Sequence, residues 1–182
     1  MKTAGVLAVV ALAMACSGQE PPRQARPPAA TAPAARLDFA EVAKVESGFE
    51  QKLKFLDPSD PFDRLGACSG VYVSGYGLVF TIPLSLVIPP TFGPFSGGYT
   101  PQKGANLHQR KLAHLPAFRT AVREMAADAA KAFGALPPNE KVVVAARLFY
   151  MDYEDRTGLP NQIVATVDRA SAPAVAIRME EQ

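Results

Sequence analysis

The side chains that could carry out chemistry are few, and they lie far apart in the sequence. Cys68 could supply a nucleophile, and His108 or His114 could supply a general base or a metal ligand. A thiolate needs a base beside it, and no sequence spacing places either histidine next to Cys68. The chain also lacks a His-Glu-x-x-His pattern and paired cysteines, the usual signs of a zinc site. We therefore expect Cys68 to be packed at the start of an apolar strand and the histidines to be solvated residues before a helix.

An acidic cluster, Asp152, Glu154 and Asp155, is the remaining candidate for a metal site. Calcium loops need oxygen ligands at alternating positions and a glycine at the sixth. Counted from Asp152, Arg156 takes the fifth position and Gly158 the seventh. The pattern therefore favours a solvated turn, and we expect neither a metal nor a cofactor.

The elements that must position these residues centre on the stretch from Cys68 to Ile82. Two β-rich runs meet at residues 74–77, Ser-Gly-Tyr-Gly, and Gly75 suits the first turn position of a type II′ hairpin because that position needs a positive φ. A two-residue turn sets Val73 opposite Leu78, and the register follows from it. One face of the hairpin would then be apolar and would face a core; it consists of Val71, Val73, Leu78, Phe80 and Ile82.

Residues 69–81 of this hairpin resemble the early hairpin of periplasmic trypsin-like proteases. That resemblance implies a catalytic histidine on the next strand, but residues 81–85 read Thr-Ile-Pro-Leu-Ser. Residues 96–98, Ser-Gly-Gly, are similar to the nucleophile motif but lack the acidic residue before it, and both histidines come later in the chain. These departures argue against protease activity.

The hairpin also resembles that of secreted bacterial proteins of unknown function, which carry a Tyr-x-x-Gly-Tyr-Gly-x-x-Phe pattern. The matching residues here are Tyr72, Gly75, Tyr76, Gly77 and Phe80. The resemblance implies a similar fold with two helices, and it implies no activity.

Periodicity predicts two helices and three further strands. Asp38 has the position of an N-cap, and an apolar stripe follows it at helical spacing, formed by Val42, Val45, Phe49, Leu53 and Leu56. A second helix is predicted from near Pro116 to just before Gly134. Strands are predicted at 141–151, 162–168 and 174–177, before a charged tail at 178–182. Arg147, alone among apolar residues in the first of these, is expected to be partly exposed or paired with a carboxylate.

The element order predicts the fold class. The order is α-β-β-α-β-β-β, with strands joined as hairpins, so we expect an α+β fold with an antiparallel sheet of about five strands covered by two helices. Residues 36–182 suffice for a single domain with one core.

The N-terminus predicts export. An apolar run at 4–15 is too short to span a bilayer, which needs roughly 20 residues, but it suits a signal peptide at 1–15. It ends in Leu12-Ala13-Met14-Ala15-Cys16, which resembles a bacterial lipoprotein signal and implies lipidation of Cys16 and a membrane anchor facing the periplasm. In a cell with two membranes, Ser17 resembles the pattern of lipoproteins sent to the outer membrane. The alternative is an ordinary signal peptide cleaved near Ala15.

Between this signal and the domain, residues 16–35 predict a tether. The stretch from residue 21 onwards is mostly proline and alanine, so it cannot bury apolar surface and should be an extended spacer.

Residues 88–104 predict a long loop, because they are rich in proline and glycine. A mobile surface insertion is the first interpretation. The alternative is a contact site for a partner, through Phe92, Phe95 and Tyr99.

Charge narrows the classes of partner. The chain has 19 basic and 17 acidic side chains, and they are interspersed rather than gathered into a basic patch, so nucleic-acid binding is not expected.

Two function classes stay open: a non-catalytic envelope lipoprotein that binds or scaffolds a partner protein, and a hydrolase-type enzyme whose site the linear sequence hides. The sequence leaves the oligomeric state open.

Overall fold

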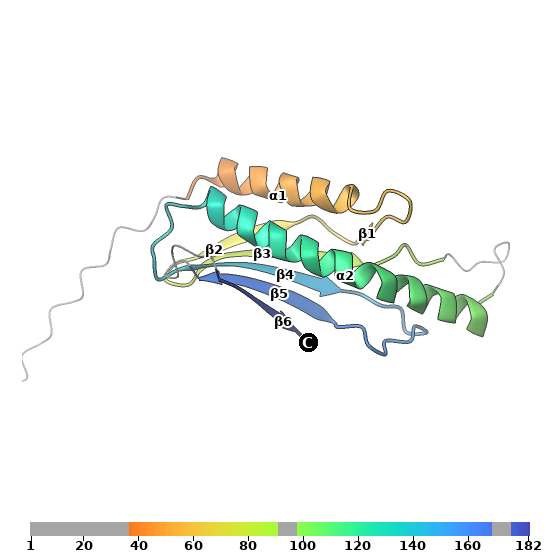
Figure 1. Cartoon of the computed structure of the whole chain (residues 1–182). Coiled ribbons are helices and arrows are strands. Elements are labelled where there is room, and N and C mark those ends of the chain that lie inside the picture. Colours follow the sequence, from red (N-terminus) through yellow and green to blue (C-terminus); the bar gives the residue numbers. More distant parts are fainter. Residues whose placement is uncertain (1–36, 91–97, 169–175) are drawn as a thin grey trace, which may run out of the picture. The chain divides into compact units, whose positions relative to one another are not determined.

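The computed structural model describes residues 37–90, 98–168 and 176–182 (Figure 1). Ala34–Gln182 forms one compact unit. The predicted signal peptide, Cys16, most of the predicted tether, Phe92 and Phe95 lie outside the described residues. The elements are α1 (Phe39–Lys54), β1 (Asp63–Arg64), β2 (Ser69–Val73), β3 (Gly77–Ser85), α2 (Pro101–Ala132), β4 (Lys141–Leu148), β5 (Gln162–Asp168) and β6 (Ile177–Glu181).

The protein is an α+β single domain with a mixed six-stranded sheet. The strands follow the order β1-β3-β4-β5-β6. Strand β2 also pairs with β3, on the same edge as β1 but along a different part of the strand. All pairs are antiparallel except β3 and β4, which run parallel with Leu78 opposite Val142. The predicted purely antiparallel sheet is therefore wrong. Because α2 carries the chain back along the sheet before β4 begins, β4 enters beside β3 in the same direction.

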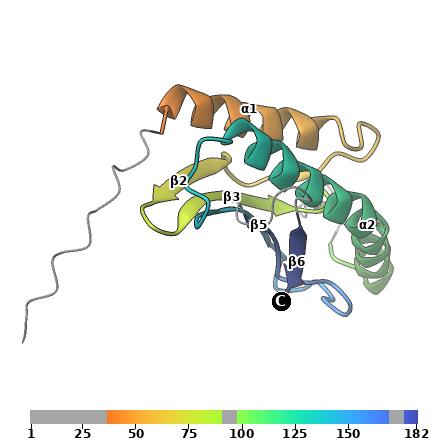
Figure 2. The same cartoon turned by 60° about the vertical axis from the view of Figure 1, so that its left-hand side comes forward.

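Both helices lie on the same face of the sheet (Figures 1 and 2). Side chains from alternate positions of the central strands meet them there, and Phe80 packs edge-on against Phe49 of α1 at 5.1 Å between ring centroids. The core contains Phe49, Leu53, Leu78, Phe80, Ile82, Leu84, Phe118, Val122, Met125, Val142, Val144, Ala146, Ile163, Ala165 and Val167. Among the described residues, neither helix is long and apolar enough to cross a membrane.

Helix α1 begins as its sequence predicts. The Asp38 carboxylate accepts a hydrogen bond from the Ala40 amide at 2.9 Å, which satisfies one of the free amides of the first turn. Val42, Phe49 and Leu53 are buried along one face.

Helix α2 begins fifteen residues earlier than Pro116, at Pro101, with Thr100 as its N-cap. Two predictions are wrong for this reason: residues 101–104 are not loop, and the two histidines do not precede a helix but lie within it. Pro101 occupies the first-turn position predicted for Pro116, where a missing amide costs nothing. Pro116 lies inside the helix, and the Thr120 hydroxyl donates to its carbonyl at 3.2 Å.

The hairpin register differs by one residue from the prediction. Val73 lies opposite Gly77 and Tyr72 opposite Leu78, so three residues, 74–76, connect the strands. Gly75 has φ +79°, as expected, but the Tyr76 amide donates to the Val73 carbonyl at 3.0 Å, and the turn is not the two-residue type II′ form. Because side chains alternate along a strand, the shift moves Val71 and Val73 off the helix-covered face.

Strand β6 lies later in the chain than predicted. The predicted charged tail contains most of this strand, Ile177–Glu181, which pairs with β5 and has Met179 opposite Ala165. Ile177, Met179 and Glu181 lie on the helix-covered side, whereas Arg178 and Glu180 point to the other side, so the segment alternates as a strand does.

Candidate functional site

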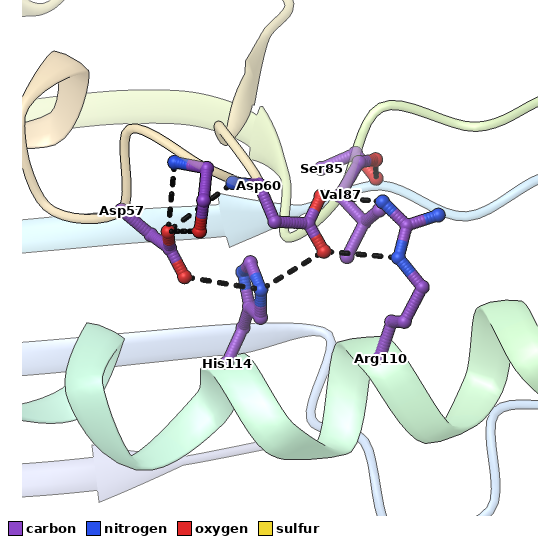
Figure 3. A network of polar contacts seen from close by, with 7 residues as sticks. Asp57, Asp60, Ser85, Val87, Arg110 and His114 are labelled. Carbon is purple, nitrogen blue, oxygen red and sulfur yellow. Dashed lines mark hydrogen bonds and ion pairs between the residues drawn. The ribbon is translucent and has the colours of Figure 1, made fainter.

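A polar network joins α2 to the loop between α1 and β1 (Figure 3). His114 Nε2 lies 3.2 Å from Asp60 Oδ2 and 3.7 Å from Asp57 Oδ2. Arg110 donates to Asp60 through Nε at 2.9 Å and also through Nη2. The hydrogen bond from Arg110 holds the pKa of Asp60 below its ordinary value of 3.8, and the hydroxyl of Ser59 lowers that of Asp57.

His114 is the side chain in this network that could act as a general base. It is 9 % exposed, so the predicted solvated histidine is wrong, and the Phe62 ring packs against it at 5.2 Å between centroids. Its Nδ1 is buried with no hydrogen-bond partner among the described residues. A histidine and an aspartate form part of a nucleophile-activating set, but the nearby Ser85 hydroxyl donates to the Val87 carbonyl at 2.9 Å. The network therefore holds a loop to a helix.

A buried ion pair joins Lys111, the residue after Arg110 on α2, to Glu154 in the loop after β4. Lys111 Nζ donates to Glu154, and the two side chains are 0 % and 4 % exposed. The ammonium also lies 4.8 Å from the centroid of the Tyr150 ring. Burial, followed by the Glu154 charge, raises the pKa of the Tyr150 hydroxyl to about 12. That hydroxyl donates to the Pro160 carbonyl at 2.6 Å.

These contacts correct the interpretation of the acidic cluster. Glu154 is not solvated, because it neutralises Lys111. Asp155 does form a turn, accepting from the Thr157 amide at 2.9 Å, and its carbonyl lies 3.0 Å from His108 Nδ1. Among residues 37–90, 98–168 and 176–182, no group of three His, Cys, Asp or Glu side chains is arranged to hold a metal ion.

Cys68 is packed, as its sequence position predicts. It is 6 % exposed, and burial together with the nearby Glu46 and Glu50 raises the pKa of its thiol to about 12. A thiol in this environment stays protonated near neutral pH and is a poor nucleophile.

Two further residues that the sequence singled out, Arg147 and Tyr99, lie at the surface. Arg147 is exposed, as one of the two interpretations predicted, and its guanidinium lies 5.3 Å from the centroid of the Phe149 ring. Tyr99 is 46 % exposed, and its ring packs against Tyr153 at 5.2 Å between centroids.

The face of the sheet opposite the helices is the largest feature that sequence reasoning missed. No helix or strand covers it in the described part of the chain (Figure 2). Val71 and Val73 on this face are 57 % and 47 % exposed. The register places further small and β-branched side chains on the same side of the sheet: Val79, Thr81, Val143, Ala145, Val164 and Thr166. Of these, Thr81 is exposed and Val79, Ala145 and Val164 are partly buried, whereas Val143 and Thr166 are only 5 % and 6 % exposed. The predicted register hid this face because it assigned the two valines to the core.

Charged side chains border this apolar area. Lys141 Nζ lies 3.8 Å from Asp168 Oδ1, and Arg178 Nε lies 2.9 Å from Glu180 Oε1. The uncovered face thus combines the exposed valines of β2 with charged pairs at its margin.

Comparisons with protein-family models, curated protein sequences and solved structures found no match to this chain.

Proposed function

We propose that this protein is a lipid-anchored protein of the bacterial cell envelope and that its folded domain binds a partner protein. The sequence supports the anchor. Cys16 follows an apolar run that ends in small residues, and a proline- and alanine-rich stretch separates it from the domain. A spacer of that composition would carry the domain away from the membrane and leave its surfaces accessible.

The observation that carries the binding role is the exposure of Val71 and Val73 on the uncovered sheet face. An antiparallel sheet that faces water on one side normally alternates apolar and polar side chains, with the polar ones outward. Here valine occupies three of the outward positions of β2 and β3, at residues 71, 73 and 79, beside the polar Ser69 and Thr81. An exposed apolar area with a charged rim marks a protein-interaction surface.

The polar clusters support binding over catalysis. Asp60 is held by Arg110, Glu154 is held by Lys111, and the thiol of Cys68 has a raised pKa. Each of these groups stabilises the fold through a partner or through burial, and an enzyme needs such groups free to meet a substrate. A hydrolase is the alternative, and its base would be His114.

Site-specific photocrosslinking in envelope membranes tests the binding role. A photoreactive amino acid at Thr81, which is exposed on the uncovered face, is expected to capture one discrete protein. Introducing Val71→Lys and Val73→Lys should reduce that product at least about tenfold, since burying two ammonium groups costs more than the roughly 1.4 kcal/mol that corresponds to a factor of ten.

The control uses the helix side of the molecule. Gln109 is exposed on α2, so Gln109→Lys changes charge without touching the sheet face. The proposal is wrong if the lysine substitutions on β2 leave the crosslink unchanged, or if Gln109→Lys removes it equally.

A further inference from the structure

The two edges of the sheet differ in how their backbone groups are occupied. At the β2 edge, helix α1 supplies acceptors: Glu46 accepts from the Gly70 amide at 2.6 Å and Glu50 from the Cys68 amide at 3.2 Å. At the other edge lies β6, and among the described residues no strand pairs with its outer side. A free strand edge presents amides and carbonyls that can pair with another chain.

The pairing of β5 with β6 shows which backbone groups are free. Gln162 and Gln182 exchange two hydrogen bonds, each of 3.2 Å. In an antiparallel pair such positions alternate, so Glu180 and Arg178 also direct their amides and carbonyls toward β5. The amides and carbonyls of Ile177, Met179 and Glu181 therefore point away from the sheet.

We propose that a second copy of this chain pairs with β6 along this edge, antiparallel and about a two-fold axis at Met179. Ile177 would then lie opposite the partner's Glu181, and Met179 opposite the partner's Met179. These are the positions whose backbone groups point outward, so the pairing satisfies them on both copies. The two sheets would join into one.

Charge fixes the register of this pairing. With the axis at Met179, Arg178 lies opposite the partner's Glu180, and symmetry repeats the pair. Both fall at the positions without backbone hydrogen bonds, where opposing side chains lie closest. A shift of the axis by one residue keeps the outward backbone groups paired but sets Arg178 against the partner's Arg178, or Glu180 against the partner's Glu180. Like charges directly opposite are destabilising, so both shifted registers are disfavoured.

The helix side of β6 has room for the partner's side chains. A groove of about 500 Å³ lies between α2 and β6, and it is lined by Pro116, Thr120 and Met179 together with the charged side chains of Arg119, Arg123 and Glu181. Ile177 and Met179 are only partly buried within one copy. Across the two-fold axis they would meet their counterparts and shield apolar surface from water. Anchoring on one membrane would raise the effective concentration of the copies.

Charge reversal on the full-length chain tests the proposal. Two differently tagged copies are produced together, extracted in mild detergent and isolated through one tag. Wild-type copies should be recovered together. Arg178→Glu or Glu180→Arg in both copies should lower recovery at least about tenfold, because each creates two repulsive pairs. A copy with Arg178→Glu and a copy with Glu180→Arg should recover together again, because each charge then meets its opposite.

The mixed pair separates pairing between copies from the salt bridge within one copy. Each single reversal breaks the Arg178–Glu180 contact inside its own chain, so a role confined to one copy predicts no rescue by mixing. Reversing the charge of Lys44, which is exposed on α1, by Lys44→Glu serves as the control and should change nothing. Circular dichroism and thermal melting confirm that each variant is folded. Failure of the wild-type copies to co-isolate, or failure of the mixed pair to do so, overturns the proposal.

Discussion

Arg110, Lys111 and His114 lie within about one turn of α2 and hold the loops on its two sides. Arg110 and His114 contact Asp60 in the loop after α1, whereas Lys111 contacts Glu154 in the loop after β4. Lys111 and Glu154 are both buried, and a buried ammonium or carboxylate costs several kcal/mol unless it is paired, so these two side chains depend on each other. The same contacts orient the loops at one end of the sheet.

At Lys111 this dependence yields a prediction. Lys111→Met should destabilise the fold by about 3–5 kcal/mol, since it leaves the Glu154 carboxylate buried without a counter-ion. Adding Glu154→Gln should recover much of that loss, because the amide keeps an acceptor for the Met151 amide without a charge. The measurement is the free energy of unfolding in urea. Lys131→Met, at a lysine whose side chain is 76 % exposed, is the control and should change stability by less than about 0.5 kcal/mol. Equal stability of the single and double variants would contradict this account.

The β2–β3 hairpin depends on glycine at two positions for two different reasons. Gly75 has φ +79°, and a Cβ added there would meet nothing within 4 Å, so only the backbone conformation restricts it. Gly77 has φ +128°, and a Cβ there would collide with the backbone of Lys141, within the pairing of β3 with β4.

The two glycines therefore predict unequal effects of the same substitution. Gly75→Ala should cost about 1–2 kcal/mol, the penalty of a left-handed conformation. Gly77→Ala should cost clearly more, since the methyl group must also displace the first residue of β4. Thermal and urea unfolding of both variants, beside Gly48→Ala on α1 as a control without such contacts, would measure this. A Gly77→Ala variant as stable as Gly75→Ala would show that the strands can separate there at little cost.

At the scale of the whole molecule, the helices occupy one face of the sheet, and no helix or strand of the described residues covers the other face, where we propose that a partner binds (Figure 2). The proposed pairing uses the β6 edge, and the proposed partner protein uses the uncovered face, so the two surfaces do not compete for the same backbone groups.

The proposed anchor predicts a change of location. Cys16→Ala should prevent cleavage before residue 16 and leave an unlipidated precursor with a lower mobility in gel electrophoresis. Fractionation of envelope membranes and metabolic labelling with a palmitate analogue would measure this, with Cys68→Ala as the control that should label as the wild type does. If Cys16→Ala retains both the label and the wild-type mobility, the anchor is wrong.

Features that depend on neighbouring residues were predictable from the sequence. The Asp38 cap and the stripe of α1 follow from side chains within a few turns of one another, and Gly75 marks a positive φ because of its own chemistry. The α+β fold class follows from the order of such local patterns. The packing of Cys68 follows from its place beside an apolar strand.

The tertiary structure decided the features that depend on residues far apart in the chain. Tyr72 faces the helix side, where its hydroxyl donates to Glu140, and this contact accompanies a register that turn chemistry alone did not predict. His114 is buried because Asp60 and Phe62 lie over it, and β6 is a strand because β5 pairs with it. A local pattern states that a side chain can be buried or paired, but its partner is fixed only when distant segments pack together.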